Sequence, residues 1–144
     1  MITITILLFV MLAIFKDDLA KYMSYKVQEN SKNTLSKTEI NNIKESYNYT
    51  ENELYEYTFL EFGAKSCIAC KKMEYVINYI DSVYQNVNVE FKNVRTESGK
   101  KYADYFGVVE IPTQILLDKN GVEFFRHKGY IAEYEIEKFF KQDQ

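Results

Sequence analysis

The segment EFGAKSCIACKK, residues 61–72, contains both cysteines of the 144-residue chain, Cys67 and Cys70. On a first helical turn, residues three apart have Cβ atoms roughly 5–6 Å from one another, so a small adjustment brings the two sulfurs within bonding distance. A disulfide over so short a loop adds little stability, because it hardly constrains the unfolded chain. The spacing therefore favours redox chemistry over a structural cross-link.

The residues around the pair predict a strand followed by a helix. Residues 56–62 are rich in aromatic and β-prone side chains, and Gly63 ends this strand. The cysteines thus lie at a helix N-terminus, where partial positive charge favours a thiolate, the nucleophile in disulfide exchange. Lys65, Lys71 and Lys72 add to that charge. The helix is indicated by apolar side chains with its period, at Met73, Val76, Ile77, Ile80 and Tyr84.

Other uses of a cysteine pair fit less well. A structural zinc site needs about four ligands, and the chain offers no third cysteine and a single histidine, His127. A c-type haem site needs histidine directly after the second cysteine, and position 71 is lysine. Two unrelated reduced thiols remain an alternative to redox activity.

The composition describes one globular domain preceded by a leader. A length of 144 residues fits a single domain. Hydrophobic side chains make up 47% of the sequence and aromatic ones 16%, which is enough to build a core. The net charge of −3 gives no electrostatic basis for binding nucleic acid, so no such partner is expected.

The N-terminus carries an uncharged apolar run from Ile2 to Phe15. This run is short for a helix that spans a bilayer and suits the apolar part of a signal sequence. We expect residues 1–24 to form a signal anchor or a signal peptide at the membrane, with a buried N-terminal helix as the alternative. Lysines follow the run and none precedes it, so the charge rule alone would leave the domain in the cytoplasm.

The next segment, residues 25–52, is dominated by Asn, Lys, Ser and Glu and is expected to be a polar tether. One short helix from Lys37 to Ser46 fits within it, with Ser36 or Thr38 as the N-cap. The globular domain is then expected over residues 53–144.

The C-terminal half supplies the remaining strands and helices. Strands are predicted at 87–91, 113–117 and 122–126, and Lys119-Asn120-Gly121 forms a hairpin turn between the last two. A helix is predicted at 98–106, ended by Gly107, and another around Ile136, Phe139 and Phe140. The order strand, helix, strand, helix, strand, strand, helix predicts an α/β fold, a mixed sheet flanked by helices.

From about Tyr55 to the C-terminus the sequence resembles the thioredoxin family. The segment Cys67-Ile68-Ala69-Cys70-Lys71 is similar to the active site, Ile111-Pro112-Thr113 to the cis-proline loop, and Asp118-Lys119-Asn120-Gly121 with Gly129 to the terminal hairpin. Within the family, the C-x-A-C-K motif and the acidic-aromatic helix after it are most similar to the C-terminal periplasmic domain of the DsbD transmembrane reductase. Two features depart from the family: Ser66 replaces the usual Trp, and Ile-Ala replaces Gly-Pro between the cysteines.

The resemblance implies a role for each matching residue. Cys67 would be the attacking thiol, and Cys70, one turn into the helix and more buried, would resolve the mixed disulfide. Glu61 lies where the family keeps a buried carboxylate that exchanges a proton with the second thiol, and an outward-facing Glu61 is the alternative. Ile111 and Pro112 would form a cis-proline loop that binds an extended substrate strand beside the disulfide.

The functional hypothesis is a thiol–disulfide oxidoreductase that reduces or exchanges disulfides in partner proteins outside the cytoplasm. A membrane-bound or thioredoxin-type donor would supply its electrons, and no cofactor is expected. A redox-inert binding or chaperone module and a metal carrier are the alternatives. A copper carrier of this fold would need three residues between its cysteines, and this chain has two, so His127 is interpreted as a surface strand residue.

Overall fold

The computed structural model describes residues 4, 5, 7, 11, 15, 18, 19, 22–30, 35–51 and 54–141. In chain order its elements are α2 (Lys37–Ser46), β1 (Tyr57–Gly63), α3 (Ile68–Val83), β2 (Val87–Asn93), α4 (Glu97–Phe106), β3 (Thr113–Asp118), β4 (Glu123–Lys128) and α5 (Glu133–Phe140). From β1 onward this is the order that the sequence predicts, and the ends of the strands and of α4 differ from the prediction by two residues at most.

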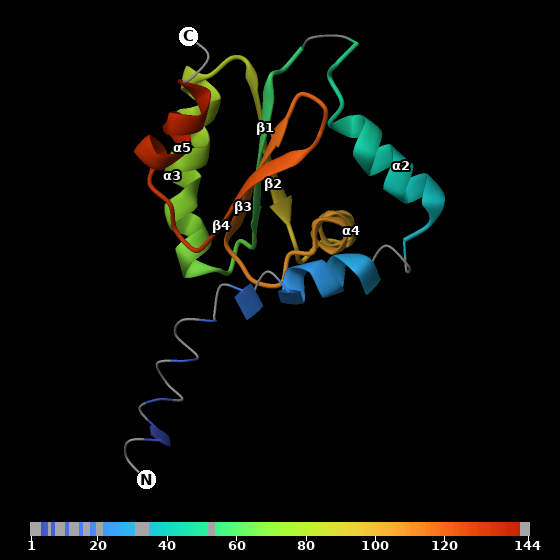
Figure 1. Ribbon diagram of the computed structural model, residues 1–144. Coiled ribbons are helices and arrows are strands. Elements are labelled where there is room, and N and C mark those ends of the chain that lie inside the picture. Colours follow the sequence, from blue (N-terminus) through green and yellow to red (C-terminus); the bar gives the residue numbers. More distant parts are fainter. Residues whose placement is uncertain are drawn as a thin grey trace.

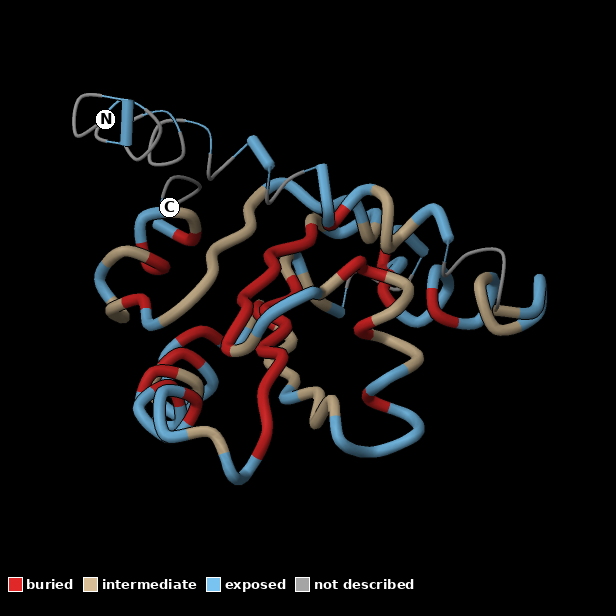
Figure 2. The backbone as a smooth tube through the Cα atoms, turned by 90° about the horizontal axis from the view of Figure 1, so that it is seen from below, coloured by how far each residue is buried: buried red, intermediate tan, exposed pale blue. Residues whose placement is uncertain are grey.

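The strands form one mixed sheet in the order β2-β1-β3-β4. β1 pairs in parallel with β2 and antiparallel with β3, and β3 pairs antiparallel with β4. Figure 1 shows α3 and α5 on one face of this sheet and α4 with α2 on the other. The predicted mixed sheet flanked by helices is therefore confirmed. β1 and β3 lie inside the sheet and are almost entirely buried, as Figure 2 shows.

Two apolar clusters fill the spaces between the sheet and its helices. Because successive strand residues point to opposite faces, alternate residues of β1 and β3 serve the two clusters. Phe59 and Leu116 pack on the side of α3 and α5, and Leu60 and Ile115 pack on the side of α4 and α2. Polar residues of β1 and β3 that share a face with Phe59 and Leu116 therefore lie on the α3 side of the sheet.

Helix α2 confirms the predicted helix from Lys37 to Ser46 and shows which of the two cap candidates is used. Ser36 Oγ accepts a hydrogen bond from the backbone N–H of Glu39, and the Glu39 carboxylate accepts one from the backbone N–H of Ser36. This reciprocal pair is a capping box, which satisfies two backbone donors that the first turn leaves free.

The segment predicted as a polar tether contributes to the core. Ile43 of α2 and Tyr47 just after it are buried, and the Tyr47 ring lies 6.1 Å from the rings of Tyr102 and Phe106. Two large apolar side chains four positions apart give the helix a buried face despite its polar composition. The prediction of a tether over 25–52 is therefore wrong for residues 37–51, which belong to the packed domain.

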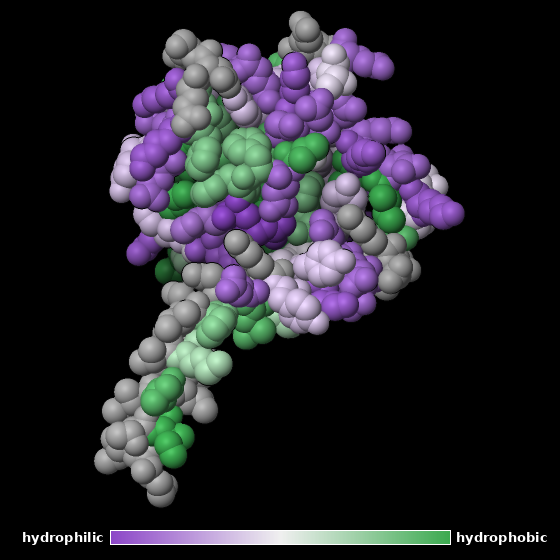
Figure 3. All heavy atoms as spheres, viewed as in Figure 1, coloured by the Kyte–Doolittle hydropathy of each residue, from purple (hydrophilic) through white to green (hydrophobic). Residues whose placement is uncertain are grey.

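The predicted signal anchor or signal peptide, residues 1–24, lies largely outside the described residues. The described side chains Ile4, Leu7, Met11, Phe15 and Leu19 are each more than half exposed, and Figure 3 shows apolar side chains on the part of the chain that extends away from the domain. Among the described residues, no helix has both the length and the apolar character needed to cross a membrane.

Residues 22–30 are helical and pack closely on the C-terminal end of α4. Gly107 ends α4 in the left-handed conformation, with φ of 64°. A Cβ atom at Gly107 would lie 2.3 Å from the carbonyl oxygen of Ser24 and 2.9 Å from Cβ of Gln28. Only glycine allows this approach, so Gly107 serves both as the helix stop and as the contact for residues 22–30.

We expect Gly107→Ala to destabilise the fold by about 2–4 kcal/mol, because it combines a left-handed alanine with a collision against the Ser24 backbone. Gly129→Ala is the matched control, since Gly129 has φ of 90° but nothing within 4 Å of its Cβ position. Urea unfolding followed by circular dichroism compares the two variants. Equal losses would mean that the packing of residues 22–30 contributes nothing to stability.

Candidate active site

The two cysteines form a disulfide at the start of α3. Cys67 is the N-cap of the helix, and Cys70 lies in its first turn. The backbone N–H of Cys70 donates a hydrogen bond to Cys67 Sγ over 3.1 Å. A sulfur that accepts a backbone hydrogen bond at a helix N-terminus is in a place that favours the thiolate once the disulfide is reduced.

The two cysteines differ in their access to solvent. Cys67 is half-buried, whereas Cys70 is only 4% exposed. Cys70 lies against the end of β1, because a Cβ atom at Gly63 would come within 3.2 Å of Cys70 Sγ and 2.8 Å of the Phe91 ring. The missing side chain of Gly63 thus makes room for both the inner sulfur and an aromatic ring from β2.

Glu61 is fully buried on the same face of the sheet as the inner cysteine. Residues two apart in a strand share a face, so Glu61 points to the same side as Phe59, which packs in the α3 cluster, and Gly63, which lies against Cys70. The alternative of an outward-facing Glu61 is wrong.

Burial also changes the acidity of Glu61. It raises the pKa of this carboxyl to about 8, and a hydrogen bond from Gln114 opposes the rise. A carboxyl with such a pKa gains and loses its proton near neutral pH, as a general acid–base group must. Its role in the reaction stays a prediction, but its place and its acidity suit that role.

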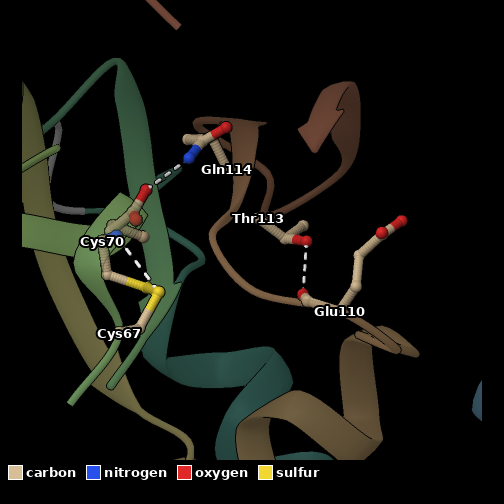
Figure 4. The surroundings of a disulfide bond; sticks show 6 residues. Cys67, Cys70, Glu110, Thr113 and Gln114 are labelled. Atoms are coloured by element: carbon tan, nitrogen blue, oxygen red, sulfur yellow. Dashed lines mark hydrogen bonds between the residues drawn. A yellow bond between two sulfur atoms is a disulfide. The ribbon is translucent and has the colours of Figure 1, made fainter. Parts of the chain in front are cut away.

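Gln114 is a second buried polar residue beside Glu61, and sequence analysis did not identify it. It pairs directly with Glu61 across β1 and β3. Its Nε2 donates a hydrogen bond to Glu61 Oε2 over 2.8 Å, drawn as a dashed line in Figure 4. The available signal was an amide side chain in the otherwise apolar strand that follows Pro112.

The loop before β3 completes the site. The Ile111–Pro112 peptide bond is cis, as the predicted cis-proline loop requires. Thr113 Oγ1 donates a hydrogen bond to the Glu110 carbonyl over 2.7 Å, and the Gly129 N–H donates one to the Pro112 carbonyl over 2.8 Å. Figure 4 shows the loop between Glu110 and Thr113 beside the disulfide. The fold therefore gathers Cys67, Cys70, Glu61 and this loop at one end of the sheet.

The surface is hollowed beside this site in two places. A cavity of about 280 Å³ opens next to Cys70, lined by Ala64, Lys65, Cys70, Glu74, Ile77, Asn78 and Phe91. Another, of about 360 Å³, is lined on one side by Val109, Glu110 and Ile111. A partner chain that reaches the disulfide therefore meets concave surface near both Cys70 and Ile111.

His127 lies on β4 and is half-buried. Its Nε2 lies 3.1 Å from the Tyr130 carbonyl oxygen. In the part of the chain that the structure describes, no three His, Cys, Asp or Glu side chains are grouped so that they could hold a metal ion.

Comparison with known proteins places this geometry in a family. The model of the thioredoxin-like domain matches residues 43–144, so the match begins within α2. No curated protein matches the sequence. Among solved structures, thioredoxin NaTrxh from Nicotiana alata is 34% identical with a TM-score of 0.55, and the match covers 69% of this chain and 83% of that one.

Two more distant structures share the fold. Thioredoxin O2 from Arabidopsis thaliana, in its oxidised state, is 17% identical with a TM-score of 0.56, over 74% of this chain and 88% of that one. Thioredoxin-2 of a malaria parasite is 22% identical with a TM-score of 0.55, over 60% and 82% of the two chains. With the Cys67–Cys70 disulfide at the start of α3 and a family match over most of its length, this chain belongs to the thioredoxin-like domain family.

Proposed function

We propose that this protein is a thiol–disulfide oxidoreductase that reduces disulfide bonds in partner proteins. The observation that carries the proposal is the asymmetric cysteine pair at the start of α3, with half-buried Cys67 as the N-cap and buried Cys70 against the end of β1. Disulfide exchange needs one thiol that reaches the partner and a second that stays out of its reach until the partner is bound.

The reaction then has two steps. The Cys67 thiolate attacks one sulfur of the partner's disulfide, that bond breaks, and the partner's other sulfur leaves as a thiolate. Cys70 gives its proton to Glu61 and attacks Cys67 Sγ in the mixed disulfide, so that the Cys67–Cys70 bond forms and the partner's second thiolate leaves. Two electrons pass from the cysteine pair to the partner, and the leaving thiolates take up protons from water or from Glu61.

The oxidised pair must be reduced again before another turnover. A dithiol protein that exchanges with Cys67 supplies two electrons and becomes a disulfide itself. We propose a membrane-bound or thioredoxin-type protein for this task, and a domain held at the outer side of the membrane by the N-terminal segment. The exposed apolar side chains from Ile4 to Leu19 support the membrane attachment, and the C-x-A-C-K motif supports the likeness to the periplasmic domain of DsbD.

Ile111 and Pro112 are proposed to bind the partner as an extended strand. The hydrogen bonds that hold this loop use the Glu110 and Pro112 carbonyls. Neither of these bonds uses the backbone groups of Ile111. An extended peptide that paired with Ile111 would run along the loop between Glu110 and Thr113, which Figure 4 shows beside the disulfide.

Reduction of insulin by dithiothreitol, followed as turbidity, tests the proposal directly. The wild-type protein should speed the reaction, and a variant with both Cys67→Ser and Cys70→Ser should not. If the two proteins behave alike, the chain is a binding or chaperone module that keeps the fold without the chemistry. Metal analysis of the anaerobically purified protein addresses a metal carrier, which would hold a stoichiometric ion bound through the two cysteines.

The different surroundings of the two thiols predict different reactivity. After reduction, Cys67 should be alkylated by iodoacetamide near neutral pH on the order of tenfold faster than Cys70, because it is more accessible and its sulfur accepts a helix N–H. Mass spectrometry of the peptide that contains both residues locates the label. Equal labelling of the two thiols in the folded protein would contradict the assigned order of attack.

A further inference from the structure

A row of side chains crosses the whole sheet beneath the inner cysteine. The strand register places Phe91 of β2 opposite Glu61, Glu61 opposite Gln114, and Gln114 opposite His127 of β4. Two residues further from the active site, the equivalent row is apolar throughout, with Val89, Phe59, Leu116 and Phe125. The row through Glu61 is called the polar row from here on, and in it two fully buried polar side chains, Glu61 and Gln114, lie on the neighbouring strands β1 and β3.

Within the polar row, Gln114 contacts one oxygen of Glu61 and leaves the other free. Its Nε2 donates to Glu61 Oε2, while Glu61 Oε1 is buried without a hydrogen-bond partner among the described residues. Gln114 Oε1 is likewise buried and unpartnered in that part of the chain. A buried amide with an unsatisfied oxygen costs stability, and an apolar side chain would avoid this cost. The hydrogen bond to Glu61 is therefore the one contact that a glutamine makes and an apolar residue would not.

We propose that Gln114 is a positioning residue for Glu61, which fixes Oε2 as a hydrogen-bond acceptor and so directs the exchangeable proton to Oε1 and towards Cys70. The inference rests on the proposed function, because that proton matters only if Cys70 must lose its own. An amide N–H can donate to Oε2 both when Glu61 is a carboxylate and when it is a carboxylic acid. Gln114 therefore holds the carboxyl in one orientation through the whole cycle.

The same hydrogen bond keeps Glu61 able to release its proton. Burial favours the protonated carboxyl, and the bond from Gln114 favours the charged form. The strand register sets Phe91 of β2 and Gln114 of β3 beside Glu61, and Cys70 of α3 lies against Gly63, two residues along the same face. None of these side chains carries a fixed charge. Without Gln114 nothing among them would oppose burial, so the pKa of Glu61 would rise further. A smaller share of the carboxyl would then be ionised at neutral pH and able to accept a proton from Cys70.

The test is the titration of Glu61 in the oxidised protein, measured by infrared spectroscopy of the protonated carboxyl. A carboxylic-acid band that persists above pH 6 in the wild type and is absent in Glu61→Gln belongs to Glu61. In Gln114→Met we expect the midpoint to rise by about one to two pH units, as expected for the loss of a hydrogen bond to a charged group. The resolving step should slow at pH 7 and recover as pH rises.

Two further variants make the result specific. Leu116→Met changes the next residue on the same face of β3, which is also fully buried, and should leave the midpoint unchanged. His127→Gln removes the other titratable group of the polar row and should leave the rise in Gln114→Met intact. A midpoint in Gln114→Met within about 0.3 units of wild type would overturn the proposal, as would an equal rise in Leu116→Met or a rise that vanishes with His127→Gln.

If Gln114→Met does not fold, Gln114→Glu keeps the shape of the side chain and places two carboxyls side by side. These would share one proton, so the upper midpoint must rise still further; an unchanged midpoint would overturn the proposal. The titration needs no partner protein. It can therefore fail while the chain still reduces insulin, or succeed while it does not, so the two proposals are tested separately.

Discussion

Cys70→Ser should convert the protein from a catalyst into a trap. With the resolving thiol absent, the Cys67 thiolate still attacks a partner's disulfide, but nothing close by can break the mixed disulfide that results. We expect turnover in the insulin assay to fall to the level without protein, and a stable adduct through Cys67 to accumulate. Non-reducing electrophoresis of the purified variant with an oxidised partner measures the adduct, which dithiothreitol should release.

The matched control is the double variant Cys67→Ser with Cys70→Ser, which should form no adduct at all. The single variant Cys67→Ser should also trap little, because Cys70 is only 4% exposed. If Cys67→Ser forms as much adduct as Cys70→Ser, the two thiols attack with equal ease and the assigned order is wrong. If neither forms an adduct while the wild type reduces insulin, the reaction does not pass through a mixed disulfide with Cys67.

Most of the fold and the centre of the site could be predicted from the sequence because their signals are local. The cysteine spacing, the apolar period that starts at Met73 and the glycine in the hairpin turn each depend on a few neighbouring residues. The helix over Lys37–Ser46 was recognisable from a cap and a length, and the structure uses the Ser36 cap. Pro112 was interpreted together with the cysteine pair, and the structure shows that the Ile111–Pro112 peptide bond is cis.

What the sequence did not reveal depends on contacts between distant segments. Gln114 became a partner of Glu61 only through the register of β1 with β3, which an apolar run does not specify for any single polar residue. Composition made residues 37–51 look like a tether, although Ile43 and Tyr47 already marked a buried face. The Phe91 ring from β2 packs against Gly63 of β1. Residue spacing along the chain does not predict a contact between two separate strands.

Glu61→Gln should raise the stability of the fold at alkaline pH and slow the resolving step of disulfide exchange. The ordinary pKa of 4.5 applies to the unfolded chain, and the folded value is about 8. Between these values the folded state holds a proton that the unfolded state has lost, so the wild type loses stability as pH rises from about 4.5 to 8. The difference converts to as much as about 4–5 kcal/mol above pH 8. Glutamine keeps the shape without the charge and removes this loss.

Urea unfolding at a series of pH values measures the effect. The gain of Glu61→Gln over wild type should be near zero at pH 4, should grow through neutral pH and should level off above pH 8. Glu74→Gln on the exposed side of α3 is a matched control that should show no such growth. A gain in unfolding free energy that is the same at pH 4 and pH 9 would mean that folding does not change the pKa of Glu61, which contradicts the prediction.

The kinetic half of the Glu61 prediction concerns the resolving step alone. Glutamine cannot accept a proton from Cys70, so release of the partner from the mixed disulfide should slow by about 10²–10⁴-fold, the usual contribution of a general base. The first attack by Cys67 should be nearly unchanged, because that thiolate is stabilised by the N-terminus of α3. Rapid mixing of the reduced variant with an oxidised partner, followed by acid quenching, separates the two steps as formation and decay of the mixed disulfide. If only the first step slows, Glu61 acts on Cys67 and not on Cys70. If the mixed disulfide decays at the wild-type rate throughout pH 6–8, Glu61 takes no part in the resolving step.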